Sequence, residues 1–173
     1  MPISLKVRAE TWPIAGAFSI SRGAKTEAHV VVAELDDGVC VGRGECVPYG
    51  RYGESLDGVI GALSAMSGPL AGGLDRVQLQ QAMPPGAARN ALDCAFWDLE
   101  AKRAAKPAHV LAGLPPPNPR VTAYTLSLGA PEAMAEAARA ASSRKLLKVK
   151  LGQPGDPERI AAVRQAAPHS ELI

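Results

Sequence analysis

The 173-residue chain has few aromatic residues, three cysteines and no long apolar run, and each shortage excludes a class of protein. Cys40, Cys46 and Cys94 are odd in number and lack C-x-x-C spacing, which argues against a disulfide framework or a zinc site. We expect reduced thiols that pack as small hydrophobic side chains. No stretch reaches the ~18 apolar residues of a transmembrane helix, and the charged Lys6 and Arg8 leave no apolar signal segment. The sequence therefore predicts a soluble, cytoplasmic protein without a membrane partner.

The charge balance gives no sign of a nucleic-acid partner. Lys and Arg number 19 against 17 Asp and Glu, for a formal net charge of +2, and aromatic residues make up only 4%. No basic run interleaved with aromatic residues is present. His29, His109 and His169 are scattered without metal-ligand spacing or a nucleophile partner, and are expected to be structural or exposed. A small-molecule substrate is the expected partner.

The first two thirds of the chain show strand patterns followed by helix patterns. An Asp-Gly step at 36–38 separates two β-branched runs, which predicts a hairpin. Apolar residues at helical spacing predict two amphipathic helices after the sheet. The expected strands are 3–9, 27–35 and 39–44, and the expected helices are 54–66 and 87–102.

A proline-rich connector at 114–119 predicts a domain boundary, because its prolines cannot continue a helix. After it the pattern alternates between strand and helix, which is typical of βαβ units with a parallel sheet. Asp156 is the expected N-cap of the last helix. Leu172 and Ile173 resemble the opening of a third strand. The expected elements are strand 121–128, helix 131–141, strand 146–151 and helix 156–167.

Lys148 and Lys150 are the most informative residues of this second part. Two residues apart on a strand, they point the same way, while Leu147 and Val149 take the opposite face. Both faces of a parallel sheet are normally covered, so two ammonium groups on one face indicate a polar cavity. The alternative is the solvated face of an edge strand, where lysine is common.

Four segments resemble the dipeptide epimerases of the enolase superfamily, above all the L-Ala-D/L-Glu type, in the right order over nearly the whole chain. They are ISRGAKTEA at 20–28, GRGECVPY at 42–49 with RYGES at 51–55, ALDCAFWDL at 91–99, and LKVKL at 147–151. The resemblance implies an α+β capping domain followed by the first part of a TIM-type (β/α) barrel, truncated at the start of the third barrel strand. The implied domains are 1–118 and 119–173.

The resemblance also implies the chemistry. Lys150 matches the base that removes the α-proton. Lys148 would disfavour protonation of Lys150 by like-charge repulsion, and it can also contact the substrate carboxylate. Mg²⁺ is the implied cofactor that holds the enolate oxygens, with ligands from barrel strands beyond Ile173 and none in this chain. The lysine that returns the proton on the other face is also expected there. Glu45 and Asp93 are expected to support the structure.

Four further residues are implied on the substrate side. Arg22 matches the arginine that pairs with the substrate side-chain carboxylate, a bidentate task suited to a guanidinium group. Thr125 matches a threonine that contacts substrate. Lys25 and Tyr52 lie in the two capping loops and are candidate pocket-lining residues.

These matches predict an isomerase that epimerises a dipeptide, with a chain too incomplete to act alone. Other enolase-superfamily reactions, of the o-succinylbenzoate synthase or muconate cycloisomerase type, share the two-lysine motif and stay open. So does a non-catalytic fragment that only binds ligand. An open barrel edge predicts a homo-oligomer or a companion chain that completes the barrel.

Overall fold

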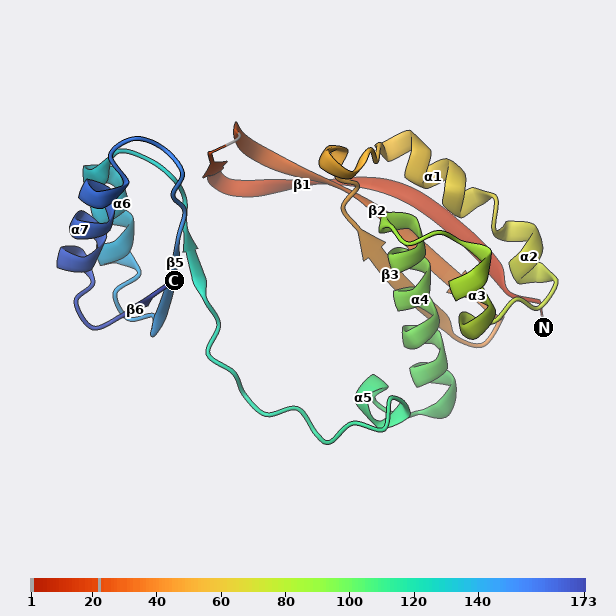
Figure 1. The fold of residues 1–173 in the computed structure, drawn as a ribbon. Helices are drawn as coiled ribbons and strands as arrows, with labels where there is room; N and C mark the ends of the chain where they lie inside the picture. Colours follow the sequence, from red (N-terminus) through yellow and green to blue (C-terminus); the bar gives the residue numbers. More distant parts are fainter. Residues whose placement is uncertain (1, 22) are drawn as a thin grey trace. The chain divides into compact units, whose positions relative to one another are not determined.

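Figure 1 shows a computed structural model that describes residues 2–21 and 23–173. The residues divide into two units. The first comprises Met1–Trp12 and Glu27–Pro117, and the second comprises Pro13–Thr26 and Asn118–Ile173. The segment Pro13–Thr26, here called the hairpin tip, thus groups with the second unit, whereas the sequence placed it within 1–118.

The first unit contains a three-stranded sheet with the order β1-β2-β3. The strands are β1 (Ser4–Ile20), β2 (Gly23–Asp36) and β3 (Val41–Cys46). The predicted hairpin at 36–38 is confirmed, because β2 pairs antiparallel with β3 from Val31↔Cys46 to Asp36↔Val41. β1 and β2 are longer than predicted, and the parts of both strands beyond the predicted ranges are largely exposed.

The turn between β2 and β3 is held by a buried carboxylate. Asp37 Oδ1 accepts hydrogen bonds from the backbone amides of Cys40 at 2.7 Å and Val39 at 2.8 Å. Its Oδ2 pairs with Arg103, near the end of the helix Ala87–Ala104. These bonds hold the pKa of Asp37 well below its usual range. Their stabilising contribution is present above the ordinary pKa of an aspartate and is lost as pH falls through the lowered value.

Helices follow the sheet in the chain. The two predicted helices are confirmed, with α1 capped by Ser55, whose hydroxyl accepts from the Gly58 amide. Four shorter helices, one of them a 3-10 helix, escaped prediction, although the helix Arg76–Ala82 carries a capping box formed by Asp75 and Gln78. The helices are η1 (Gly50–Tyr52, 3-10), α1 (Leu56–Ser64), α2 (Ser67–Ala71), α3 (Arg76–Ala82), α4 (Ala87–Ala104) and α5 (Ala108–Leu111).

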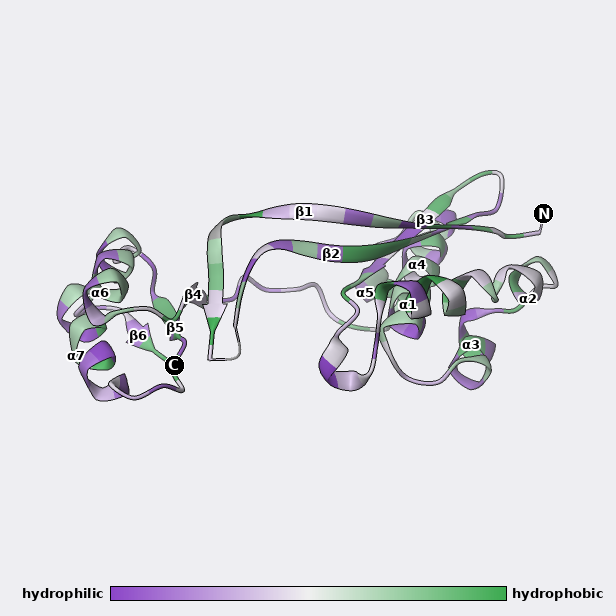
Figure 2. Ribbon diagram, turned by 90° about the horizontal axis from the view of Figure 1, so that it is seen from above, coloured by the Kyte–Doolittle hydropathy of each residue, from purple (hydrophilic) through white to green (hydrophobic). Residues whose placement is uncertain are grey.

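The core of the first unit lies between the sheet and helices α1 to α4, which lie on one side of the sheet in Figure 1. Val31, Ala33 and Leu35 of β2 belong to this core, and Figure 2 colours part of β2 as hydrophobic. Gly42 and Gly44 let α4 approach β3 closely, because a Cβ built on Gly44 would lie 1.9 Å from the Ala91 carbonyl oxygen. Fully buried members of the core include Val31, Leu35, Leu63, Leu70, Leu79, Leu92 and Leu99.

The second unit alternates strand and helix, as predicted. Its elements are β4 (Tyr124–Leu126), α6 (Pro131–Ala140), β5 (Leu146–Val149), α7 (Asp156–Ala166) and β6 (Glu171–Leu172). The strands are parallel in the order β4-β5-β6. Residues from these strands and helices form one buried cluster, namely Leu126, Met134, Ala138, Ala141, Leu147, Val149, Val163 and Ala167. The α+β cap followed by barrel-type βαβ units is therefore the observed fold class.

The prediction that Asp156 caps α7 is wrong. Gly155, at φ 89°, occupies the N-cap position, and Asp156 is the first residue of the helix. The Asp156 carboxylate instead accepts a 2.7 Å hydrogen bond from the Gly152 amide in the preceding loop. A glycine can adopt this left-handed conformation without the steric penalty that a side chain would cause. The N-cap is therefore one residue earlier than predicted.

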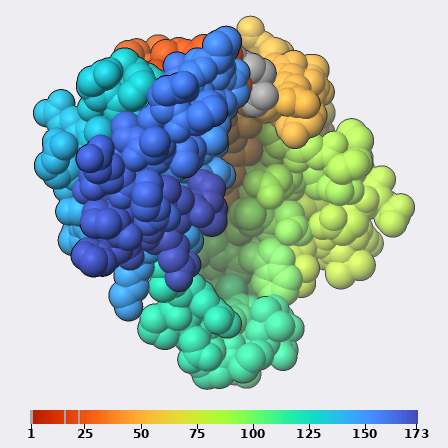
Figure 3. Space-filling view, turned by 60° about the vertical axis from the view of Figure 1, so that its left-hand side comes forward, coloured from red at the N-terminus to blue at the C-terminus, as the bar shows by residue number. Residues whose placement is uncertain are grey.

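The connector between the units is extended and exposed. All residues from 112 to 122 are exposed, and the green to teal part of the chain lies at the surface in Figure 3. Its four prolines, at positions 115, 116, 117 and 119, exclude a helix.

Candidate active site

The carboxyl end of β5 places two lysines on one face of the parallel sheet. Leu147 and Val149 are buried against α6 and α7, whereas Lys148 is exposed and Lys150 is half-buried. The side chains alternate, so both lysines lie on the face opposite the helices. The backbone amide of Lys150 donates to the Leu126 carbonyl at 3.1 Å, which continues the pairing with β4 beyond the strand. Barrel active sites form at this end of the strands.

Thr125 lies beside the lysines. Its Cα is the register partner of Lys148 in the parallel pair of β4 and β5, and the residue is half-buried. Residues directly opposite in adjacent strands share a face about 4.8 Å apart. The structure thus places Thr125 beside Lys148, with Lys150 two residues farther along the same chain. Their joint role in substrate binding stays a prediction.

The hairpin tip contacts the loop that follows β4. The Leu128 amide donates to the Ser19 carbonyl at 3.1 Å, so the backbones of tip and loop are joined directly. The Ser127 hydroxyl accepts from the Ser19 amide and donates to the Ala17 carbonyl, each at 3.3 Å. Ser127 is a position that sequence patterns missed, because a serine after a strand is an ordinary loop residue.

The hairpin tip also contacts the loop that follows β5. Gln153 Nε2 donates to the Ser21 carbonyl at 3.4 Å, and a Cβ built on Gly152 would lie 3.1 Å from the Ser21 Cβ. The Phe18 ring, part of the tip, has the Lys150 ammonium 6.0 Å from its centroid. The tip therefore covers the lysine end of β5. Arg22, next to Ser21, lies outside the described residues.

The other candidate pocket-lining residues lie in different units. Lys25 is exposed near the start of β2 in the hairpin tip. Tyr52 belongs to η1 of the first unit, is 76% exposed and has its ring centroid 5.6 Å from that of Tyr49. The backbone carrying Tyr52 is fixed by Glu54, whose carboxylate accepts from the Ala87 amide at 2.6 Å and the Tyr49 amide at 3.0 Å. These bonds hold the pKa of Glu54 below its usual range.

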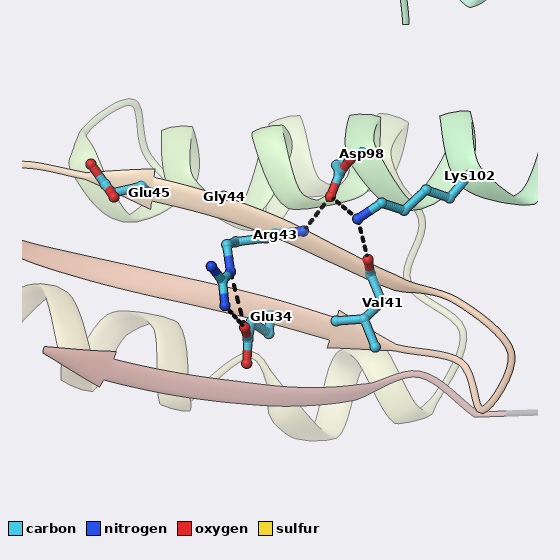
Figure 4. Close-up of a pocket in the computed structure, with 7 residues that line it drawn as sticks. All are labelled: Glu34, Val41, Arg43, Gly44, Glu45, Asp98 and Lys102. Carbon is cyan, nitrogen blue, oxygen red and sulfur yellow. Dashed lines mark hydrogen bonds and ion pairs between the residues drawn. The ribbon is translucent and has the colours of Figure 1, made fainter. Parts of the chain in front are cut away.

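A charged groove on the first unit contains Glu45 (Figure 4). Four of the charged side chains that line it form two ion pairs, and Glu45 is in neither pair. Arg43 contacts Glu34 at 2.6 Å, and the Asp98 carboxylate accepts from Lys102 at 2.7 Å and from the Arg43 amide at 2.8 Å. The groove therefore links β2, β3 and α4. Asp93, on α4, accepts from Gln80 of α3 at 2.8 Å.

Neither thiols nor histidines form a reactive cluster in residues 2–21 and 23–173. The three cysteines are free, and burial raises the pKa of the Cys46 thiol to about 11. Cys94 is exposed, unlike the half-buried hydrophobe that the sequence suggested. Within the same residues, no three His, Cys, Asp or Glu side chains gather closely enough to bind a metal ion. None of the described helices is long and apolar enough to cross a membrane.

Comparison with known proteins shows consistent similarities. Residues 2–113 match the family model of the mandelate racemase / muconate lactonizing enzyme N-terminal domain. L-Ala-D/L-Glu epimerase of Escherichia coli (strain K12) is 44% identical over 172 residues, which are 98% of this chain and 54% of that protein. N-acetyl-D-glutamate racemase of a Pseudoalteromonas species is 38% identical over 147 residues, covering 83% of this chain and 46% of that protein.

Solved structures agree with these relatives. An enolase family member from Agrobacterium tumefaciens, with homology to dipeptide epimerases and with bound sodium and L-Ala-L-Glu, is 49% identical at a TM-score of 0.94. The match covers 99% of this chain and 52% of that one. A dipeptide epimerase from Enterococcus faecalis, complexed with Mg and L-Leu-L-Tyr, is 28% identical at a TM-score of 0.87, over 99% and 52%. The chain thus spans about half the length of the proteins it matches.

Proposed function

The chain belongs to the mandelate racemase / muconate lactonizing enzyme family, and from this membership we propose that the full-length protein is a dipeptide epimerase of the L-Ala-D/L-Glu type. The observation that carries the proposal is the lysine pair at the end of β5. Lys148 and Lys150 share a face with Thr125 under the hairpin tip, in a chain that is 44% identical to an L-Ala-D/L-Glu epimerase.

The chemistry assigned to these residues is proton removal. Epimerisation breaks the Cα–H bond next to a carboxylate, so a base must reach that proton within about 3 Å. Lys150 takes the proton through its Nζ atom, and its half-buried side chain places that atom 6.0 Å from the centroid of the Phe18 ring. Lys148 lies two residues before Lys150 on the same face. Lys148 and Thr125 orient the substrate carboxylate.

Mg²⁺ is part of the proposal only for the portion of the protein beyond this chain. The described residues contain no cluster of acidic or histidine ligands that fits it, so no step is assigned to the metal here.

The free thiols of this chain suit a reducing compartment, and we place the enzyme in the cytoplasm. A second copy or a companion chain that adds strands beside the parallel sheet also belongs to this proposal.

A racemase of an N-acylated acidic amino acid is a second candidate. The Pseudoalteromonas relative, named an N-acetyl-D-glutamate racemase, favours it. Both substrates present a glutamate whose amino group is acylated, so one base and one carboxylate clamp would serve either. The ratio of kcat/KM for L-Ala-L-Glu to that for N-acetyl-L-glutamate separates the two, and the dipeptide is expected to be preferred.

Arg22 tests the substrate part of the proposal. Arg22→Met in the full-length protein should lower kcat/KM for L-Ala-L-Glu by about 10-fold or more relative to L-Ala-L-Leu, because a charge-assisted pair is lost only with the acidic side chain. Arg120→Met, in the exposed connector, serves as the matched control and should change neither value. Equal losses for the acidic and neutral dipeptides would show that Arg22 merely supports the turn.

A further inference from the structure

We propose that Arg159 and Asp156 are positioning residues of the enzyme. Together they fix the loops that follow β4 and β5, and through these loops they set the docked position of the hairpin tip over Lys150. The inference rests on the proposed function for its kinetic consequence, whereas its structural consequence can be measured independently of any activity.

The Arg159 side chain joins the two loops. It is only 15% exposed, and its Nε donates to the Gly129 carbonyl in the β4–α6 loop at 2.7 Å. Its Nη1 donates to the Pro154 carbonyl at 2.8 Å and to the Gln153 carbonyl at 3.3 Å in the β5–α7 loop. A guanidinium has donors on a rigid planar fork, so one side chain can hold two loops at a defined separation.

Asp156 completes the arrangement from the other side. One carboxylate oxygen pairs with Arg159 at 3.0 Å, and the other accepts from the Gly152 amide at 2.7 Å. These bonds lower the pKa of Asp156, the Gly152 bond contributing most, so the carboxylate stays ionised at neutral pH. Gly152 is two residues beyond Lys150, so the pair fixes the backbone exit from the catalytic strand.

Each of the two fixed loops contacts the hairpin tip. The β4–α6 loop does so through Ser127 and Leu128, which bond to Ser19. The β5–α7 loop does so through Gln153, which bonds to Ser21. The tip therefore docks on two loops whose spacing is set by one arginine. Since Ser21 precedes Arg22, movement of either loop would displace the residue proposed to bind the substrate side chain.

The same helix supplies a matched control. Arg164, one and a half turns farther along α7, donates to the carbonyls of Ala167, Pro168 and Ser170 at 3.4, 3.1 and 2.7 Å. It resembles Arg159 in making three bonds to main-chain carbonyls. These carbonyls lie in the connection to β6, at the opposite end of the strands from the lysines. Arg164→Met thus removes similar bonds without touching the loops under the tip.

The experiment compares Arg159→Met with Arg164→Met in the full-length protein by amide hydrogen exchange. The Leu128 and Ser19 amides report docking directly, because each donates across the contact between loop and tip. In Arg159→Met both amides should exchange about 10-fold faster or more, whereas in Arg164→Met they should keep wild-type rates. Unchanged rates in Arg159→Met, or equal acceleration in both variants, would overturn the inference.

A kinetic measurement separates positioning from general stability. Arg159→Met should raise KM for L-Ala-L-Glu by about 10-fold with a smaller change in kcat, and Arg164→Met should leave the KM unchanged. Arg159→Lys, which keeps the charge but cannot span both loops, should give intermediate exchange and serves if the Met variant does not fold. An equal fall in kcat in both arginine variants with constant KM would contradict positioning. If wild type epimerises nothing, the proposed function fails, and hydrogen exchange still decides the role of Arg159.

Discussion

Replacing Lys150 with alanine in the full-length protein is expected to abolish deuterium exchange at the glutamate α-carbon from one epimer of Ala-Glu. The loss should be at least about 10²-fold, which is the usual contribution of a general base. Exchange from the other epimer depends on a base on the opposite side of the substrate and should fall less at the first deprotonation. The measurement is the initial rate of α-proton loss in D₂O for each epimer.

Lys145→Ala is the control for Lys150→Ala. Lys145 is exposed, precedes β5 and engages β6 only through its carbonyl, which accepts from the Glu171 amide at 2.8 Å. The control removes the same charge at the opposite end of the strand and should leave both exchange rates at wild-type values. If Lys150→Ala exchanges the α-proton of both epimers at wild-type rates, Lys150 is not the base.

Gly44→Ala is expected to destabilise the first unit by about 3 kcal/mol, at the upper end of overpacking effects. The new Cβ would lie 1.9 Å from the Ala91 carbonyl oxygen and 2.7 Å from the Ala95 amide nitrogen, both of them backbone atoms of α4. Neither can rotate away, so β3 and α4 must separate and expose core residues. Urea unfolding followed by circular dichroism measures the change.

Gly61→Ala makes the same chemical change where there is room. Gly61 lies within α1, and nothing lies within 4 Å of a Cβ built there. Alanine has a higher helix propensity than glycine. The free energy of unfolding of this variant should therefore equal that of wild type or exceed it by up to about 1 kcal/mol. The packing account fails if the unfolding midpoint of Gly44→Ala matches that of Gly61→Ala.

Patterns between neighbouring residues were enough to predict much of this fold. The Asp-Gly step at 36–38 predicted the hairpin between β2 and β3, and the alternation of strand and helix patterns in 121–167 predicted the βαβ units. The spacing of Lys148 and Lys150 was sufficient to place both on one face, because strand geometry has a period of two. These features depend on local geometry and need no knowledge of distant contacts.

Features that depend on contacts between distant residues were not predictable. Nothing in the sequence around Glu54 indicates that its carboxylate would bond to Ala87, 33 residues away. Arg159 has the appearance of an ordinary surface arginine, and its bond to Gly129 arises only when two loops meet. Gly42 and Gly44 did carry a signal, since alternate glycines in a strand mark close backbone approach, but the partner helix could not be named from it.

The central claim is tested most directly by proton NMR of L-Ala-L-Glu incubated in D₂O and Mg²⁺ with the full-length protein. The account predicts that the glutamate α-proton is replaced by deuterium while the alanine α-proton stays. Signals of L-Ala-D-Glu should appear at the same time, because proton return occurs on either face. Retention of the glutamate α-proton, with no second epimer after prolonged incubation at high enzyme concentration, would contradict it.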